Sequence, residues 1–223
     1  MLWLSIGENC LTDNILARFG KKSFSSPYSP CRSNIDYALE LEKNRYADWL
    51  LPENLEEGDA WGKRVIRSKI INKCSDNYNS AHMKGFEFTH HDPLVSEQHR
   101  ESFVRKAERM NALRHKEDVI SFYHHRICNK SDLVSLREKL IKFLNGYKSE
   151  KNVVKVAFFY QTLVDENSER KVESTYHGGD LMEFNFFTKA MWEGSDQEIF
   201  WGRVDNDLIQ EMISYVSCIT DGK

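Results

Sequence analysis

The 223-residue sequence has no C-x-x-C pair, no excess of positive charge and no long hydrophobic run. Its five cysteines are odd in number and widely spaced, which disfavours a disulfide scaffold or a structural zinc site and suits a reducing cytoplasm. The balance of 31 basic and 34 acidic residues argues against nucleic acid as the main ligand. Because there is neither a membrane-length apolar run nor a basic leader, we expect a cytoplasmic protein without a membrane partner.

Segments with strand character alternate along the chain with segments of helical periodicity. Strands are predicted at residues 2–6, 64–71, 85–89, 119–123 and 153–160, and helices at 11–19, 35–50, 96–113, 131–145 and 208–216. This alternation predicts a single α/β domain over residues 1–223, with a mostly parallel sheet covered by helices on both faces in three layers. Residues 51–85 fit the pattern least well and are expected to form a lid or an excursion.

The start of the chain places a cysteine at the beginning of a predicted helix. The apolar strand stops at Gly7, Asn9 is a good N-cap, and Cys10 then lies in the first helical turn. A helix N-terminus favours a thiolate and can hold an oxyanion, because its N–H groups lack partners and carry partial positive charge. This effect is worth only about 0.3 to 1 kcal/mol, so a nucleophilic Cys10 needs a partner. The alternative is a small buried side chain that packs the helix on the sheet.

Candidate partners for the thiol follow other predicted strands. These side chains are His90, His91, Asp92, His124 and His125. Ligands of parallel sheets bind outside the carboxyl ends of the strands, so the active site is expected at that edge. Thiolate catalysis needs an imidazole as base and a third group that orients it. Successive side chains on a strand point to opposite faces, so at most one of His90 and His91 reaches Cys10.

The acid that orients the imidazole has three candidates. Asp92 follows His91 directly and cannot readily orient that ring within a strand, so it suits His90 or a backbone group better. Asp36 and Asp180 are the other two candidates. Contacts with the substrate or the oxyanion are predicted for Gly7, Asn9, His90, Asp36, His124 and His125.

The segment Ser5-Ile6-Gly7-Glu8-Asn9-Cys10 resembles the opening of a bacterial family described as papain-like cysteine peptidases, whose members begin Ser-(Leu/Ile)-Gly-x-Asn-Cys. Asn34-Ile35-Asp36-Tyr37 stands where the family carries Phe-Asp-Trp, and keeps the acid and an aromatic residue. A later His-Asp pair of the family is similar to His91-Asp92. The resemblance covers the first hundred residues or so. It implies a Cys10 nucleophile with a histidine partner and favours His91 as that base. No cofactor is predicted.

The predicted function is cysteine-dependent acyl transfer, as in a papain-like peptidase or a thiol hydrolase. The Gly-x-Asn-Cys opening is also similar to that of polysaccharide-modifying acetyltransferases, and transfer to a sugar would use the same nucleophile, base and oxyanion donors. A metal site of two histidines and one carboxylate is another alternative. A noncatalytic carbohydrate or peptide cleft near Trp192, Trp201 and residues 177–180 is a third. The expected partner is a small molecule, a peptide or a saccharide, and the oligomeric state stays open.

Overall fold

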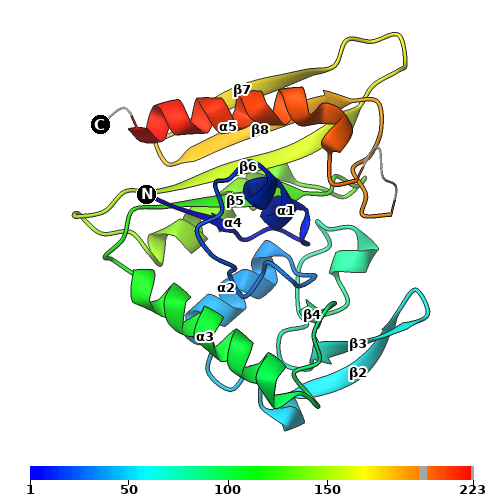
Figure 1. The fold of residues 1–223 in the computed structure, drawn as a ribbon, viewed down its shortest axis with the longest axis vertical. Helices are drawn as coiled ribbons and strands as arrows, with labels where there is room; N and C mark the ends of the chain where they lie inside the picture. Colours follow the sequence, from blue (N-terminus) through cyan, green and yellow to red (C-terminus); the bar gives the residue numbers. More distant parts are fainter. Residues whose placement is uncertain (196–199, 222–223) are drawn as a thin grey trace.

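A five-stranded sheet forms the centre of the computed structural model, which describes residues 1–195 and 200–221. Its strands lie in the order β1-β5-β6-β8-β7 (Figure 1). Their bounds are β1 Leu2–Ser5, β5 Val119–His125, β6 Val154–Leu163, β7 Lys171–His177 and β8 Leu181–Thr188. Strands β1, β5, β6 and β8 run parallel, and β7 pairs antiparallel with β8. The predicted α/β class with a mostly parallel sheet is confirmed.

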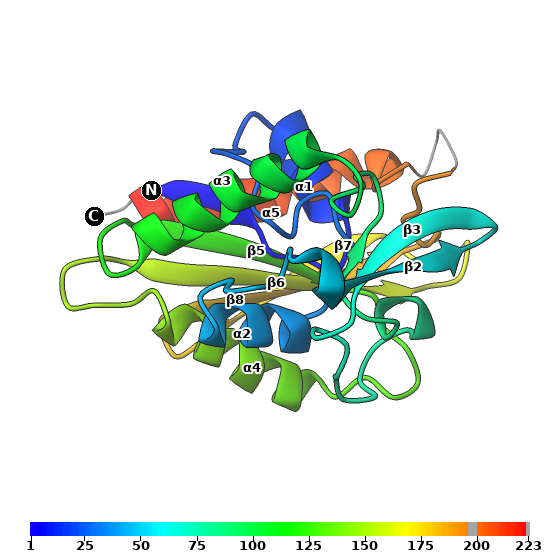
Figure 2. The ribbon, with the colours of Figure 1, turned by 90° about the horizontal axis from the view of Figure 1, so that it is seen from below.

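Helices cover both faces of this sheet (Figure 2). Their bounds are α1 Leu11–Arg18, α2 Ile35–Lys43, α3 Glu97–Leu113, α4 Leu133–Asn145 and α5 Asn206–Asp221. Helices α1 and α5 share one hydrophobic core with Phe122 and Phe159, whereas α2 and α4 share the other with Tyr123 and Phe158. Neighbouring residues of each strand thus face different layers, as the alternation of a strand requires. Within the described residues, no helix is both long and apolar enough to cross a bilayer.

Backbone conformation sets the helix ends more tightly than hydrophobic periodicity does. Helices α2 and α3 begin directly after Asn34 and Ser96, whose side chains cap them by accepting hydrogen bonds from backbone amides of the first turn. Helix α2 ends at Lys43 rather than near residue 50, because Arg45 and Tyr46 have φ angles of 51° and 61°. A left-handed backbone of this kind cannot continue a right-handed helix.

A second, antiparallel sheet of three strands lies beside the main one. It is built from β2 Leu55–Ala60, β3 Lys63–Ser68 and β4 Glu87–Phe88 in the order β2-β3-β4. Elsewhere, short 3₁₀ segments occur at η1 Pro52–Asn54, η2 Ser80–His82 and η3 Arg203–Asp205. The expectation that residues 85–89 join the main sheet is therefore wrong. Phe88 packs against Trp49 and Phe103, with ring centroids 5.6 and 4.9 Å away, and this aromatic cluster holds β4 against α3.

Strands β2 and β3 form a hairpin that projects from the body of the molecule (Figure 2). Its two-residue turn is Trp61-Gly62, with φ angles of 54° and 75°. Two positive φ angles are what a type I′ hairpin turn requires, and glycine supplies the second one without strain. The hairpin lies within residues 51–85, for which a lid stays a prediction.

Candidate active site

The loop after β1 brings Cys10 to the start of α1 through a close backbone approach. A Cβ at Gly7 would lie only 2.5 Å from Thr12 Oγ1, so glycine fits here and a larger residue does not. Cys10 occupies the N-cap position of α1, and the Asn9 side chain accepts a hydrogen bond from the Leu11 amide at 3.0 Å. Cys10 therefore precedes the first turn of α1, rather than lying within it as predicted, and Asn9 still accepts a hydrogen bond from that turn.

His90 is the imidazole that lies beside the thiol. Its Nε2 is 3.6 Å from Cys10 Sγ, although the two residues are 80 positions apart in the chain. The His90 side chain is exposed and follows β4, so this contact joins the second sheet to the end of β1. The structure thus brings together two of the predicted site residues.

His91 and Asp92 make other contacts. The His91 ring packs edge-on against His99 and Phe103, with centroids 4.9 and 5.5 Å away. Asp92 accepts hydrogen bonds from two backbone amides in the turn before α3 and pairs with Arg64. His91, the histidine that the family resemblance favours, therefore does not lie beside the Cys10 thiol. Adjacent side chains diverge as expected, but the preceding histidine is the one that faces Cys10.

A buried carboxylate beneath the cavity was not anticipated from the sequence. Glu8 is fully buried, and it accepts hydrogen bonds from the Tyr123 hydroxyl at 2.9 Å and the Arg126 amide at 3.2 Å. The Nδ1 atoms of His82 and His125 lie 2.8 and 2.7 Å from the same carboxylate. Burial raises the pKa of Glu8, but the two imidazoles outweigh burial and hold that pKa well below its usual range. Glu8 is thus an ionised group surrounded by hydrogen-bond donors.

His82 connects this carboxylate to the cavity that contains the thiol. It belongs to η2, and it lines the same cavity as Cys10 and His90. Glu8 occupies the variable position of the Gly-x-Asn-Cys opening, and His82 lies in the weakly patterned stretch 51–85, so no motif of the sequence marks either residue. The available signal was a charged residue placed between an apolar strand and a helix, where burial is expected.

His124 and His125 lie inside β5 rather than after it. His125 uses its second nitrogen, Nε2, to contact Ser131 Oγ at 2.7 Å. His124 packs against Phe159 and Trp192, and burial lowers its pKa to about 3, so its ring is neutral at physiological pH. Both histidines therefore belong to the interior, against the expectation of substrate contacts.

The other candidate acids form ion pairs away from His90. Asp36 lies 2.7 Å from Lys139 Nζ, and Asp180 pairs with Lys148. In residues 1–195 and 200–221, no three His, Cys, Asp or Glu side chains are grouped so that they could hold a metal ion. The orienting group of the His90 ring is therefore not among the carboxylates named from the sequence.

A cavity of about 640 Å³ opens over the thiol. Its lining includes the imidazoles of His82 and His90 and the cationic side chains of Arg32, Lys63 and Arg126. Burial raises the pKa of the Cys10 thiol, and this outweighs the lowering by its own backbone N–H and by Arg32. The resting thiol is therefore protonated at neutral pH, and a nucleophile at this position needs a base.

A thiol beside an imidazole at a helix N-terminus, in an α/β fold, is an arrangement suited to thiol-based hydrolysis. Residues 1–170 match the family described as "putative papain-like cysteine peptidase", and the chain belongs to this family. No curated protein and no solved structure matches the chain. The family confirms the resemblance of the opening motif and supports an enzyme of the cysteine hydrolase class. It lends no support to the acetyltransferase and binding-protein alternatives.

Proposed function

We propose that the protein is a cysteine peptidase or a related thiol hydrolase, with Cys10 as nucleophile and His90 as general base. The 3.6 Å approach of His90 Nε2 to Cys10 Sγ, at the wall of an open cavity, carries this proposal. A nucleophile within reach of a base is the geometry of covalent acyl transfer. Such contacts are often long without substrate and shorten when substrate binds.

The reaction runs through a thioester. Cys10 gives its proton to His90 as Sγ bonds the acyl carbon, and the oxyanion faces the start of α1, whose first amides lack partners within the helix. His90 passes the proton to the leaving amine or alcohol as that bond breaks. Water then attacks the thioester and loses a proton to His90, which returns it to the departing thiolate.

Trapping the thioester tests the proposal. After brief mixing with p-nitrophenyl acetate and acid quenching, intact and peptide mass spectrometry should find one acetyl group on Cys10. Cys10→Ala should abolish the adduct, whereas Cys218→Ser, which alters an exposed thiol on α5, should leave it unchanged. An adduct spread over several cysteines, or no faster than that of a free thiol, would rule out the proposed function. A panel of peptides then separates peptidase from esterase activity.

The Glu8–His82 pair supplies a second candidate base, because the carboxylate orients an imidazole that lines the same cavity. Matched variants separate the two candidates. If His90 is the base, His90→Gln should slow acylation of Cys10 about 10²-fold or more. His82→Gln should then slow acylation much less. The reverse order of the two rates, measured by release of p-nitrophenol, would assign the proton transfer to His82.

A further inference from the structure

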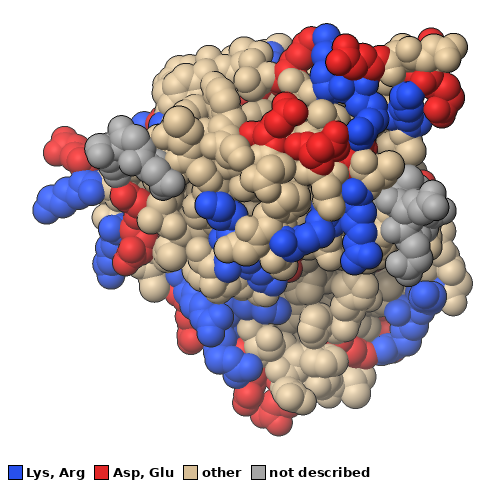
Figure 3. Space-filling model, turned by 45° about the horizontal axis from the view of Figure 1, so that its top comes forward, with Lys and Arg blue, Asp and Glu red and all other residues tan. Residues whose placement is uncertain are grey.

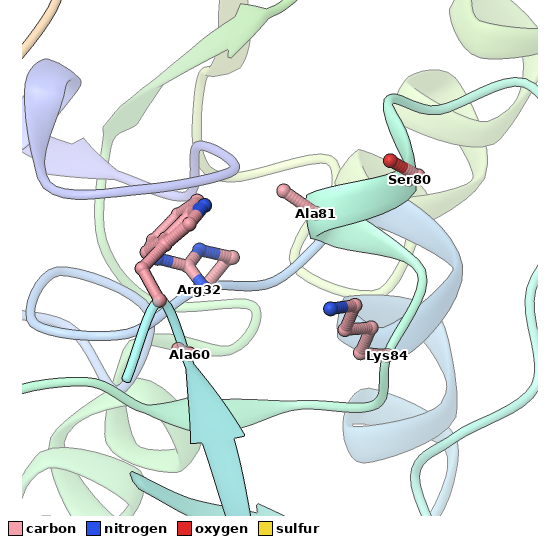
Figure 4. A pocket seen from close by; sticks show the side chains of 6 residues that line it. Arg32, Ala60, Ser80, Ala81 and Lys84 are labelled. Carbon is pink, nitrogen blue, oxygen red and sulfur yellow. The ribbon is translucent and has the colours of Figure 1, made fainter. Parts of the chain in front are cut away.

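The cavity over Cys10 continues into a smaller hollow with a positively charged lining. Arg32, Trp61 and Ala81 line both spaces, and Ser80 and Lys84 line the smaller one. Figure 4 shows the amine of Lys84 pointing across the hollow toward Arg32. The two cations therefore come from separate segments, one before α2 and the other after η2, and converge on the smaller hollow.

The charge of this region is opposite to that of the whole chain, which is −3. The cations of the two linings are Arg32, Lys63, Lys84 and Arg126. Among the described lining residues, Glu193 carries the one carboxylate. On the face drawn in Figure 3, basic side chains run across the middle, and acidic ones lie mostly toward its upper part and margins. Cations gathered around a hollow concentrate their field there and attract anions.

Arg32 is held in a fixed position by contacts on two sides. Its Nη1 donates to the buried Glu87 carboxylate at 2.6 Å, and the ring of Trp61 lies 4.2 Å from its guanidinium carbon. Glu87 also pairs with Arg67 at 2.9 Å, so one carboxylate is shared between two guanidinium groups and a net positive charge remains. The other N–H groups of Arg32 donate to no side chain in the described part of the chain. A fixed guanidinium of this kind suits a carboxylate, because little side-chain entropy is lost on binding.

We infer that this hollow is a carboxylate subsite, so that the hydrolase prefers a substrate with an acidic group next to the acyl group that is cleaved. The inference rests on the proposed function, because Cys10 defines where the acyl group lies. Arg32 and Lys84 bind the carboxylate. Trp61, which is 76% exposed at the hairpin tip, covers the apolar part of the substrate between the two sites.

Two alkylating reagents that differ in charge test the subsite. Iodoacetate and iodoacetamide share the reacting carbon and leaving group, and only iodoacetate carries a carboxylate. The measured quantity is the ratio of their rates at Cys10, divided by the same ratio at the exposed Cys218 in the same sample. At low salt this normalised ratio should be about three or more, and it should fall toward one as salt is added. Lys84→Glu should lower it several-fold.

Lys116→Glu is the matched control, since Lys116 is an exposed lysine just before β5, at the end of that strand opposite the cavity. It should leave the normalised ratio unchanged. A ratio of one or less that does not respond to Lys84→Glu would overturn the carboxylate subsite, even if Cys10 forms the thioester. If instead no thioester forms on Cys10, the proposed function fails first, and the alkylation ratio still reports whether the hollow attracts anions.

Discussion

Cys10 is a thiol that burial keeps protonated, and His90 is the group that can change this. Their 3.6 Å separation leaves the Cys10 proton within reach of the imidazole, so the proposed reaction has that proton move as the substrate is attacked. The helix alone cannot supply the activation, because its effect is worth about 1 kcal/mol or less and burial acts in the opposite direction.

The pH dependence of acylation follows from this protonation state. Without His90, Cys10 reacts only as a thiolate formed by loss of its proton to solvent. Burial places the thiol pKa above the ordinary cysteine value of about 8.5, so acylation of His90→Gln should rise only above that pH. The wild-type rate should reach its plateau at a lower pH, because the base accepts the proton during the attack. Stopped-flow rates with p-nitrophenyl acetate measure both profiles, and coincident midpoints would contradict this account.

At the scale of elements, the junction of β1 and α1 depends on the contact between Gly7 and Thr12. A Cβ added at Gly7 would lie 2.5 Å from Thr12 Oγ1 and 3.3 Å from Thr12 Cβ. Gly7→Ala should therefore push the first turn of α1 outward, cost about 1–3 kcal/mol of unfolding free energy, and slow acylation of Cys10. The loss is read from urea unfolding at pH 7 and from acylation rates.

A double variant provides the control for this contact. Thr12 Oγ1 is buried without a hydrogen-bond partner among the described residues, so Thr12→Ala alone should change stability little. In the Gly7→Ala/Thr12→Ala protein, the missing hydroxyl should restore part of the lost stability, which gives a favourable coupling energy in a double-mutant cycle. Strictly additive effects would show that the close approach is not what makes glycine necessary.

The elements that the sequence predicts well are those defined by local signals. Periodicity and caps mark helices such as α3, and continuous apolar runs mark β5 and β6. Strand β4 lies within the predicted strand 85–89, but the prediction of the sheet it joins is wrong, because its pairing with β3 is set by distant packing. The sequence cannot decide between His90 and His91 for a similar reason, since parity shows that the two side chains diverge but not which one faces Cys10.

At the scale of the whole molecule, Glu8 ties together segments that are far apart in sequence. Its partners His82 and His125 are 74 and 117 positions away, so the bonds link the end of β1 to η2 and to β5. No local pattern in the sequence can show such a connection. The network also fixes the cavity wall, because His82 belongs to both.

Acid unfolding should report this connection. The pKa of Glu8 is lower in the folded than in the unfolded chain, where a glutamate titrates near ~4.3. Its stabilisation is therefore fully present above that pH and is lost as the pH falls toward the folded-state pKa, by up to about 1.4 kcal/mol per pH unit. Glu8→Gln should cost about 1–3 kcal/mol at pH 7, because buried donors such as the Tyr123 hydroxyl and the Arg126 amide lose their charged acceptor.

The unfolding free energy of Glu8→Gln should also decline less steeply than that of the wild type between pH 5 and pH 3, in the range where a free glutamate takes up its proton. Urea titrations at each pH measure this difference. Glu138→Gln, which changes an exposed glutamate on α4, should keep both the wild-type stability and the wild-type slope. Parallel curves for Glu8→Gln and the wild type would mean that the carboxylate is not held ionised. Packing alone, and not the charge of Glu8, would then hold β1, η2 and β5 together.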